Sequence, residues 1–421
     1  SHAARLELIN YVFASIPVYY MSNILFSKKF LAKLAAVIRN FWWVGVREEA
    51  GSKALCLRAW KDICTPKKEG GLGIKNMLAM NQGLLLAAAW RLADNPDSHI
   101  YQVLRAKYFP GSSIWRANSN TPKSAFWASV LKVMPMLKAN SFYQISQGNV
   151  SVWSSPWCST WHNLYDHLII QQSSNFIYPA KVSDLWLPGR KVWNTQLVSN
   201  LFMEPSASAI IATPILLDDC RDILCWDLTP SGKCNSKSTY KLCLQQIHSV
   251  QANQPRQVNT SIQSILQQVW KEKFMAPRVH TFAWRLLRRA LPSGARAGRF
   301  SVHISTLCAR CNIEEDDLHL FFLCSFAKAA WFAHPWYIRS EFLVANHTSV
   351  ADIIIALSTS NHPHATISNI FTFMWCLWKA RNEVLFCRKF SLPHQVQHAA
   401  LAISSLQDFH EQKLQEVNPS S

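Results

Sequence analysis

The sequence predicts a mainly α-helical protein with a helical bundle-like N-terminal region, a small α+β middle region with hairpins, and a helical C-terminal domain around a cysteine-rich cluster. Three observations support this fold class. Apolar residues recur at helical spacing near both ends of the chain. Tryptophan-rich segments in the middle alternate around glycine-containing turns. Three cysteines and one histidine fall within residues 308–324.

The N-terminal region, residues 1–110, has the periodicity of packed helices. Leu31, Leu34, Ala35 and Ile38 recur at intervals of three and four, which places them on one face of a helix. Residues 81–93 are apolar almost throughout, which is typical of a buried helix. We therefore expect this region to form one all-helical domain.

A glycine-rich segment, residues 64–76 (CTPKKEGGLGIKN), lies between two of these helices. A phosphate-binding loop follows a strand and has glycines at fixed spacing. No strand is predicted before this segment, and Gly70, Gly71 and Gly73 fit neither standard spacing. The pattern predicts a turn that binds no phosphate.

The middle region, residues 111–247, is predicted to contain two hairpins. Residues 143–153 alternate on both sides of a Gln-Gly-Asn turn at 147–149. Residues 222–228 and 233–240 flank a second turn at 229–232, and the later segment runs into a helix. The polar residues 248–264, rich in Gln and Asn and without an apolar period, predict a linker.

Two helical parts follow the linker: a domain at residues 265–340 that holds the cysteine-rich cluster, and C-terminal helices at residues 341–421. One helix of the second part has a continuous apolar stripe. The stripe consists of Ile367, Ile370, Phe371, Met374, Trp378 and Leu385. An amphipathic helix at about residues 393–415 closes the chain.

The composition limits the partners and the compartment. Lys and Arg outnumber Asp and Glu by 43 to 25, a net charge of +18 at pH 7, which favours polyanions such as nucleic acid. Twelve irregularly spaced cysteines without a secretory signal indicate a reducing compartment, the nucleus or cytoplasm, for a protein that is not secreted. The apolar residues 8–26 are interrupted by Asn10, Pro17 and Asn23, so we expect no membrane partner.

The cluster at 308–324 has the ligand types and spacing of a zinc site. Cys308, Cys311, His319 and Cys324 supply four nitrogen and sulfur ligands, the number that a tetrahedral structural zinc takes. Catalytic zinc keeps a position for water, so a complete set of four protein ligands predicts one structural zinc that holds a fold. The C-terminal domain is therefore expected to be zinc-stapled; the alternative is buried free thiols beside a surface histidine.

Acidic residues lie inside this motif, and basic residues lie upstream of it. Residues 314–317 are four consecutive acids, and together with three thiolates around one zinc ion they should repel phosphate. The residues upstream are basic, and the helix predicted from residue 277 has an apolar stripe on one side and arginines on the other. The candidate nucleic-acid-binding residues are Arg278, Arg285, Arg288, Arg289, Arg296 and Arg299. An ordinary solvated helix face remains the alternative.

Several segments resemble one family in the order in which they occur. Residues 269–299 (VWKEKFMAPRVHTFAWRLLRRALPSGARAGR), followed by CARC, HLFFLC and AW, resemble the reverse transcriptase zinc-binding domain of plant LINE-type, non-LTR retrotransposon proteins. The blocks RLELINYVFASIPVYYMS, NFWWVG, GNVSVWSSPW and WCLWKARNEVLF also resemble these proteins. The resemblance implies that residues 1–110 follow a polymerase palm and that residues 265–340 are the zinc-binding domain.

The resemblance also implies which activities to expect. Reverse transcriptases use paired aspartates in the palm, whereas the one adjacent pair here, Asp218 and Asp219, falls where the family has no catalytic site. We expect a fragment that is not an enzyme and that binds template RNA or target DNA. The first rival hypothesis is a zinc-stapled module that docks either a protein partner or the missing polymerase domain of the same polyprotein. The second is a truncated form of an active RNA-directed DNA polymerase.

Overall fold

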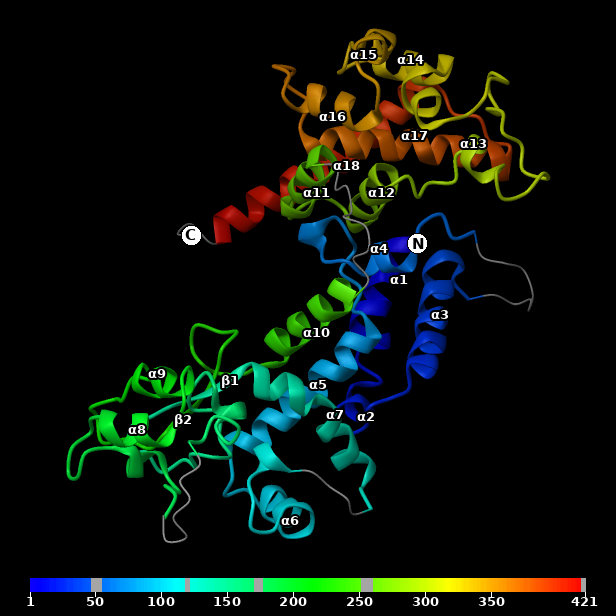
Figure 1. Cartoon of the computed structure of the whole chain (residues 1–421). Helices are drawn as coiled ribbons and strands as arrows, with labels where there is room; N and C mark the ends of the chain where they lie inside the picture. Colours follow the sequence, from blue (N-terminus) through cyan, green and yellow to red (C-terminus); the bar gives the residue numbers. More distant parts are fainter. Residues whose placement is uncertain (47–54, 118–121, 170–176, 251–259, 418–421) are drawn as a thin grey trace. The chain divides into compact units, whose positions relative to one another are not determined.

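The computed structural model describes residues 1–46, 55–117, 122–169, 177–250 and 260–417. These residues are mainly helical and include one sheet of two strands (Figure 1). They form two compact units, unit 1 with residues 1–15, 33–75 and 254–421, and unit 2 with residues 16–32 and 76–253. The predicted fold class, mainly α with a small α+β part, is confirmed.

The division into units differs from the predicted order of domains. The predicted N-terminal region 1–110 is split, because residues 1–15 and 33–75 pack with the C-terminal part of the chain. No unit boundary lies at residues 110–111. The predicted linker 248–264 is wrong at both ends, because residues 248–250 and 260–264 are helical; the remaining part of this prediction, residues 251–259, lies outside the described residues.

The regular elements of unit 1 are helices and helical turns in the part of it that the structure describes. From its N-terminal segments come α1 (His2–Leu8), the π-helix η1 (Ile9–Phe13), most of α3 (Lys28–Val44), α4 (Trp60–Cys64) and the 3-10 turn η2 (Lys67–Glu69). From its C-terminal segment come α11 (Thr260–Lys271), α12 (Pro277–Leu287), α13 (Gly294–Ala297), the π-helix η6 (His319–Leu323), α14 (Ser325–Phe332), α15 (Ser340–Asn346), α16 (Val350–Ser358), α17 (Ile367–Cys387) and α18 (Pro393–Val417).

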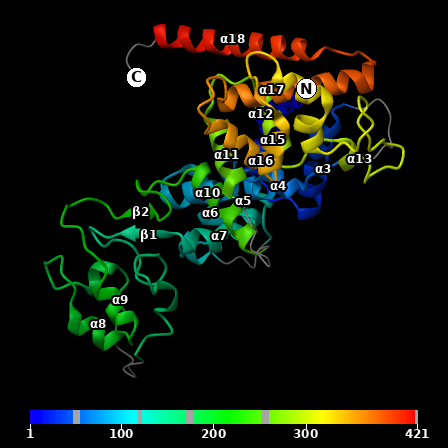
Figure 2. The same ribbon diagram turned by 90° about the horizontal axis from the view of Figure 1, so that it is seen from above.

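The core of unit 1 forms around α12 and α17. Trp284, Phe321, Phe371 and Phe373 are each fully buried there. The long α18 runs alongside α17 (Figure 2), and α11, α12 and α16 pack against α17 as well. The predicted stripe of α17 is buried except for Leu385, which is 39% exposed.

The glycine-rich segment at 64–76 is a structural turn of unit 1, as predicted. The Trp284 indole Nε1 donates a hydrogen bond of 3.0 Å to the Gly70 carbonyl. Gly70 has a φ of +83°, and a Cβ at Gly71 would lie 2.0 Å from the Thr65 carbonyl oxygen. These glycines therefore permit close packing of the chain against α12, and the segment is not a phosphate loop.

Unit 2 combines helices with the small sheet. Its helices are α2 (Val18–Met21), α5 (Met77–Asp94), α6 (His99–Tyr108), α7 (Ala125–Ala139), α8 (Thr195–Leu201), α9 (Ser206–Ile211) and α10 (Ser236–Val250). Short 3-10 turns are η3 (Ile114–Arg116), η4 (Trp161–Asn163) and η5 (Val182–Leu185). The strands are β1 (Ser141–Gln144) and β2 (Ile223–Trp226).

The predicted buried helix at 81–93 is α5, the centre of unit 2. Asn76 caps it, because its side-chain oxygen accepts from the backbone N–H of Leu78 at 3.0 Å and of Ala79 at 3.1 Å. A Cβ at Gly83 would lie 2.9 Å from the backbone nitrogen of Tyr240. This glycine lets α5 and α10 pack backbone against backbone.

Neither predicted hairpin forms. Strand β1 pairs antiparallel with β2, with Ser141 opposite Trp226 and Gln144 opposite Ile223, instead of folding back on residues 150–153. The turn at 229–232 does form, but the chain after it enters α10 and adds no strand. Alternation of side chains predicts a strand correctly but does not choose its partner.

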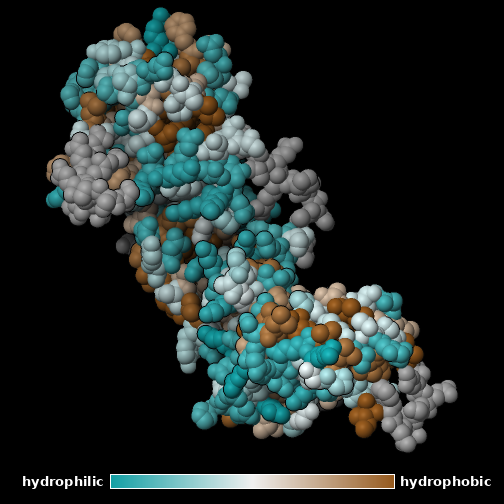
Figure 3. Space-filling model, turned by 90° about the vertical axis from the view of Figure 1, so that its left-hand side faces the viewer, coloured by the Kyte–Doolittle hydropathy of each residue, from teal (hydrophilic) through white to brown (hydrophobic). Residues whose placement is uncertain are grey.

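The described helices contain no single helix that is long and apolar enough to cross a membrane. One bent pair, Ser340–Asn346 and Val350–Ser358, passes by length and composition, with an angle of 113° between its members. On the face drawn in Figure 3, hydrophobic side chains lie scattered among hydrophilic ones.

Candidate metal centre and basic surface

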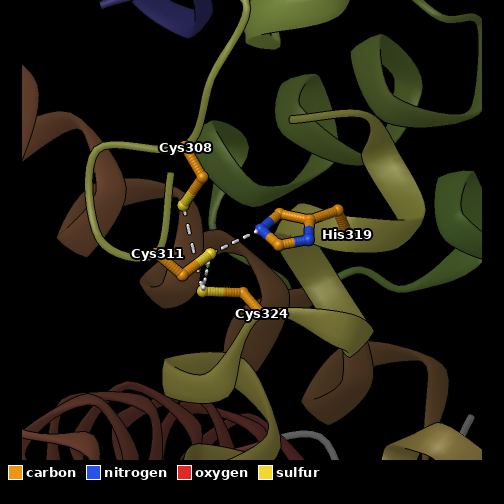
Figure 4. A group of neighbouring side chains, drawn as sticks. All are labelled: Cys308, Cys311, His319 and Cys324. Carbon is orange, nitrogen blue, oxygen red and sulfur yellow. Dashed lines mark hydrogen bonds between the residues drawn. The ribbon is translucent and has the colours of Figure 1, made fainter. Parts of the chain in front are cut away.

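A tight turn positions the first two cysteines. The backbone N–H of Cys308 donates to the Ile313 carbonyl at 2.8 Å, and that of Asn312 donates to the Cys308 carbonyl at 2.9 Å. Asn312 has a φ of +58°, a left-handed conformation that asparagine tolerates better than most residues. The turn brings the thiols of Cys308 and Cys311 to the same side of the chain (Figure 4).

A single π-helical turn presents the other two ligands. The Cys324 N–H donates to the His319 carbonyl at 2.7 Å, which closes the wider turn of η6. The Asp316 carboxylate accepts from the His319 N–H at 2.6 Å and so caps the start of this turn. Cys324 then directly precedes α14, so the ligand spacing 319–324 is set by one local element.

The four ligand atoms converge within unit 1. They all lie within 4.8 Å of one another, and Figure 4 shows the three sulfurs and the His319 ring turned toward a common point. The Cys324 Sγ lies 3.9 Å from the sulfur of Cys308 and 3.9 Å from that of Cys311. Two sulfurs bound to one tetrahedral zinc at about 2.3 Å are about 3.8 Å apart, so these distances fit zinc.

The surroundings of Cys308 favour a thiolate. The side-chain hydrogen bond from Cys324 lowers the pKa of the Cys308 thiol to about 4, against the opposing effect of burial. Backbone N–H groups of Arg310 and Cys311 and the side chain of His319 act in the same direction. The same bond to Cys308 raises the pKa of Cys324, because this thiol is the donor. Zinc would replace that shared proton and bind both sulfurs as thiolates.

An arginine lies beside the sulfurs. The Arg310 guanidinium packs over the Phe326 ring, 3.6 Å from its centroid, and is positioned electrostatically to favour the thiolates of Cys308 and Cys324. Three thiolates and one histidine around zinc carry about one negative charge, which this guanidinium offsets. Ala327 and Phe326 pack against the cysteines, and the fully buried Phe321 and Phe322 of η6 pack on Phe282 and Trp331.

The four acids at 314–317 do not form one exposed acidic loop. Glu315 is 1% exposed. Its carboxylate accepts from the Gly294 N–H at 2.8 Å and from Nε of the Arg381 guanidinium at 3.0 Å. Asp317 pairs with Arg296 at 2.5 Å. The expected repulsion of phosphate therefore weakens, since these carboxylates are neutralised inside unit 1.

The structure separates the six predicted arginines into different environments. Arg285 is turned inward: its Nε donates to the Ala290 carbonyl at 3.2 Å, and a terminal nitrogen lies 3.3 Å from His2 Nδ1. Burial lowers the pKa of Arg285 to about 10. Arg296 is held by Asp317, and Arg288 is only half-exposed. The predicted row of arginines on α12 is therefore interrupted at Arg285, whereas Arg296 lies in α13 and pairs with Asp317.

The remaining arginines are exposed at two places. Arg278 lies over the Trp375 ring at 4.8 Å, beside Lys379, whose Nζ lies 5.2 Å from the same ring. Helix α12 ends at Leu287, and Arg289 follows in the left-handed region with a φ of +52°. Arg289, with Arg296 and Arg299, lines a groove of about 340 Å³.

Sequence reasoning missed Arg310 and Arg381 as parts of the site. Arg310 lies between the first two cysteines of the motif, and Arg381 lies 66 residues from the acid it neutralises. The signal for Arg381 was the acidic run itself, because a buried carboxylate needs a cationic partner. Nothing in the spacing identifies which of many arginines supplies it.

Comparisons with known proteins agree with this site. Residues 235–331 match the family described as zinc-binding in reverse transcriptase, a range that starts one residue before α10 and upstream of the predicted boundary at 265. An Arabidopsis thaliana protein named "Putative ribonuclease H protein" is 26% identical over 337 residues, 79% of this chain and 52% of the relative. An Arabidopsis thaliana protein named "Uncharacterized mitochondrial protein" is 30% identical over 145 residues, 34% of this chain and 92% of the relative.

The chain thus spans about half the length of the longer relative and nearly all of the shorter one. Its matched family, its four converging ligands and the sequence blocks shared with retrotransposon proteins lead to the same assignment. The chain belongs to the family of retrotransposon reverse transcriptase proteins that carry the reverse transcriptase zinc-binding domain, and it corresponds to their carboxyl-terminal part.

Proposed function

We propose that this chain is a non-catalytic, nucleic-acid-binding part of a LINE-type, non-LTR reverse transcriptase, and that it binds template RNA or target DNA. The observation that carries the proposal is the groove of about 340 Å³ in unit 1, lined by Arg289, Arg296 and Arg299. Arg289 and Arg299 are exposed. Guanidinium groups pair well with phosphate, and the chain's surplus of positive charge adds general attraction.

Each side of the groove has a distinct role in this proposal. Asp317 holds the Arg296 side chain against the wall, so Arg296 shapes the groove. No ion pair joins Arg289 or Arg299 to an acid in the described part of the chain, which leaves both guanidiniums for phosphate. The groove is connected to the zinc site through the chain, because its lining residues Asp316, Asp317 and Leu318 lead to His319 and Asp316 accepts from the His319 N–H.

The test compares the full chain with an Arg289→Ala, Arg299→Ala double variant. Binding of labelled RNA and DNA is titrated at several salt concentrations by fluorescence anisotropy. The double variant is expected to lower the salt slope by about 2, since each phosphate contact contributes about 1. Arg339→Ala is the matched control, because this exposed arginine of unit 1 pairs with Glu341 at 3.1 Å. An unchanged affinity and slope in the double variant would refute the proposal.

The lack of catalysis is part of the same proposal. Asp219 is 83% exposed at its side chain and lies 3.9 Å from Lys191, which is the setting of a surface ion pair. The purified chain, supplied with Mg²⁺ or Mn²⁺, primer-template and RNA–DNA hybrid, is expected to extend no primer and to cleave no strand. Either activity, abolished by Asp218→Asn, would support instead a truncated active polymerase. We propose the nucleus as the place where the chain meets its nucleic acid.

A second candidate function is a zinc-stapled module that docks a protein. The inward position of Arg285 and the Arg296–Asp317 pair favour it, because they reduce the charge available to phosphate. In that case the purified chain would bind nucleic acid weakly and without difference between wild type and the double variant.

A further inference from the structure

Unit 2 contains a cavity that the arginine groove of unit 1 does not explain. Its volume is about 590 Å³, and it lies between the end of α7, strand β1 and the segment 156–162. The lining includes Lys138, Phe142, Trp157, Trp161, His162 and Asp227. Cavities of this size that combine apolar walls with a few polar groups are typical of ligand sites.

Lys138 in the lining and Arg116 nearby bring positive charge to this cavity, whose lining also holds one acidic residue, Asp227. Burial lowers the pKa of Lys138, and the nearby Arg116 lowers it further. Burial also lowers the pKa of His162, and Lys138 adds to this effect. Across the described residues, no ion pair joins Lys138 or Arg116 to a carboxylate.

The helix end explains only part of this arrangement. Lys138 lies in the last turn of α7, where the helix dipole favours a cation. The dipole does not account for Arg116 and His162, which come from η3 and η4 and bring further positive or ionisable groups beside Lys138. Like charges held together raise the free energy of the fold, and an anion bound from outside would lower it.

Aromatic rings face the same cavity. Phe142 lines the cavity and is 41% exposed, so its ring is accessible to a ligand. The His162 ring lies against Trp161 with centroids 4.2 Å apart, which fixes its plane. Trp157 is 2% exposed, and its indole donates to the Val152 carbonyl at 2.8 Å, so the floor of the cavity is rigid. Exposed rings beside cations are the elements that bind single-stranded nucleic acid.

We propose that this cavity binds one nucleotide of a single-stranded nucleic acid, with the phosphate at Lys138 and His162 and the base against the rings of Phe142 and His162. Asp227, the acid in the lining, would accept a hydrogen bond from a ribose hydroxyl or a base amino group. This second site lies entirely in unit 2 and is separate from the groove proposed in unit 1. It stands or falls independently of that groove.

The test uses the full chain and short labelled oligonucleotides of about ten nucleotides, a length within the range that one single-strand site covers. Lys138→Gln is expected to weaken binding of single-stranded RNA or DNA several-fold and to lower the salt slope by about 1. Lys132→Gln is the matched control, because Lys132 is an exposed lysine of α7 outside the cavity lining. The proposal is overturned if Lys138→Gln changes binding no more than Lys132→Gln does.

A second variant separates base stacking from phosphate binding. Phe142→Ala is expected to weaken single-stranded oligonucleotides about tenfold, since stacking of one base contributes about 1–3 kcal/mol, and to leave binding of inorganic polyphosphate unchanged. Equal loss for both probes, or loss for neither, would contradict the proposed base contact. A free mononucleotide that competes as well as the oligonucleotide would identify a nucleotide pocket instead of a strand-binding site. The Arg289 and Arg299 variants, measured in parallel, report on unit 1 alone.

Discussion

At the scale of single residues, the metal centre depends on side chains that do not bind the metal. Arg310 offsets the charge of the thiolates, and Glu315 connects the ligand loop to α13 and, through Arg381, to α17. The Glu315–Arg381 pair is almost completely buried. The ligands and the charged side chains around them therefore support one another. We expect loss of a ligand to remove the metal, and loss of a supporting charge to lower the free energy of unfolding.

The first prediction concerns the metal. Cys324→Ser is expected to abolish the one zinc per chain and to unfold residues 300–335, because structural zinc contributes folding free energy. Zinc content by elemental analysis and hydrogen exchange of this segment measure both effects. Cys387→Ser is the control, because Cys387 is exposed and lies outside the cluster. Soluble, folded wild-type protein without zinc would overturn the assignment.

The second prediction concerns the buried ion pair. Glu315→Gln leaves the Arg381 guanidinium buried without its counter-charge, so we expect the free energy of unfolding to fall by about 3–5 kcal/mol. Urea denaturation followed by circular dichroism measures this change. Glu341→Gln, which breaks an exposed pair with Arg339, should leave the free energy of unfolding nearly unchanged. Similar small effects of both substitutions would show that the buried pair does not stabilise the fold.

At the scale of elements, side-chain and backbone contacts decide where segments end and which of them meet. In unit 2, the Asp222 carboxylate precedes β2 and accepts four backbone N–H bonds from residues 146, 148, 149 and 150. This contact holds the predicted hairpin turn open against β2 instead of letting it close on itself. In unit 1, a Cβ at Gly294 would lie 2.7 Å from the Thr306 carbonyl oxygen, so α13 begins with glycine where the ligand loop approaches.

The third prediction tests this carboxylate. Asp222→Ala leaves four backbone donors without their acceptor, and we expect a loss of about 3 kcal/mol or more in the free energy of unfolding. The transition of unit 2 in hydrogen exchange should shift, while zinc content stays unchanged. Asp219→Ala is the matched control, because this neighbouring carboxylate is largely exposed. Equal effects of the two substitutions would argue against a specific role of Asp222.

At the scale of the whole molecule, the chain is interleaved, because its N-terminal helix belongs to the same unit as the zinc site. Helix α1 packs on α12, where His2 accepts from the inward-facing Arg285 and lies edge-on to Trp42 with ring centroids 5.2 Å apart. Burial, and then Arg285, lower the pKa of His2 from 6.5 to about 3. The His2 imidazole is therefore neutral in the folded protein at neutral pH.

The fourth prediction is the pH dependence that follows. Between pH 6.5 and about 3 the unfolded chain binds a proton at His2 that the folded chain does not, so stability present above pH 6.5 is lost as the pH falls. The slope is up to about 1.4 kcal/mol per pH unit. His2→Gln should flatten the curve relative to wild type in urea denaturation at several pH values. His303→Gln, at an exposed histidine, should not. Parallel curves for wild type and His2→Gln would contradict this role.

The sequence predicted those features that are encoded over short distances. The spacing of Cys308, Cys311, His319 and Cys324 specifies the ligand set, since one tight turn and one π-helical turn suffice to arrange them. The apolar periods at 81–93 and 367–385 likewise specify helices α5 and α17, because every residue of such a stripe lies within a few turns of the next.

Only the tertiary structure decided which distant segments meet. It paired β1 with β2 instead of with its neighbour, joined Glu315 to Arg381, and turned Arg285 toward His2. Each of these contacts joins residues separated by 66 positions or more. Several partners of the same chemical type compete at such separations, and the choice is made by packing of the whole core, which no local pattern contains.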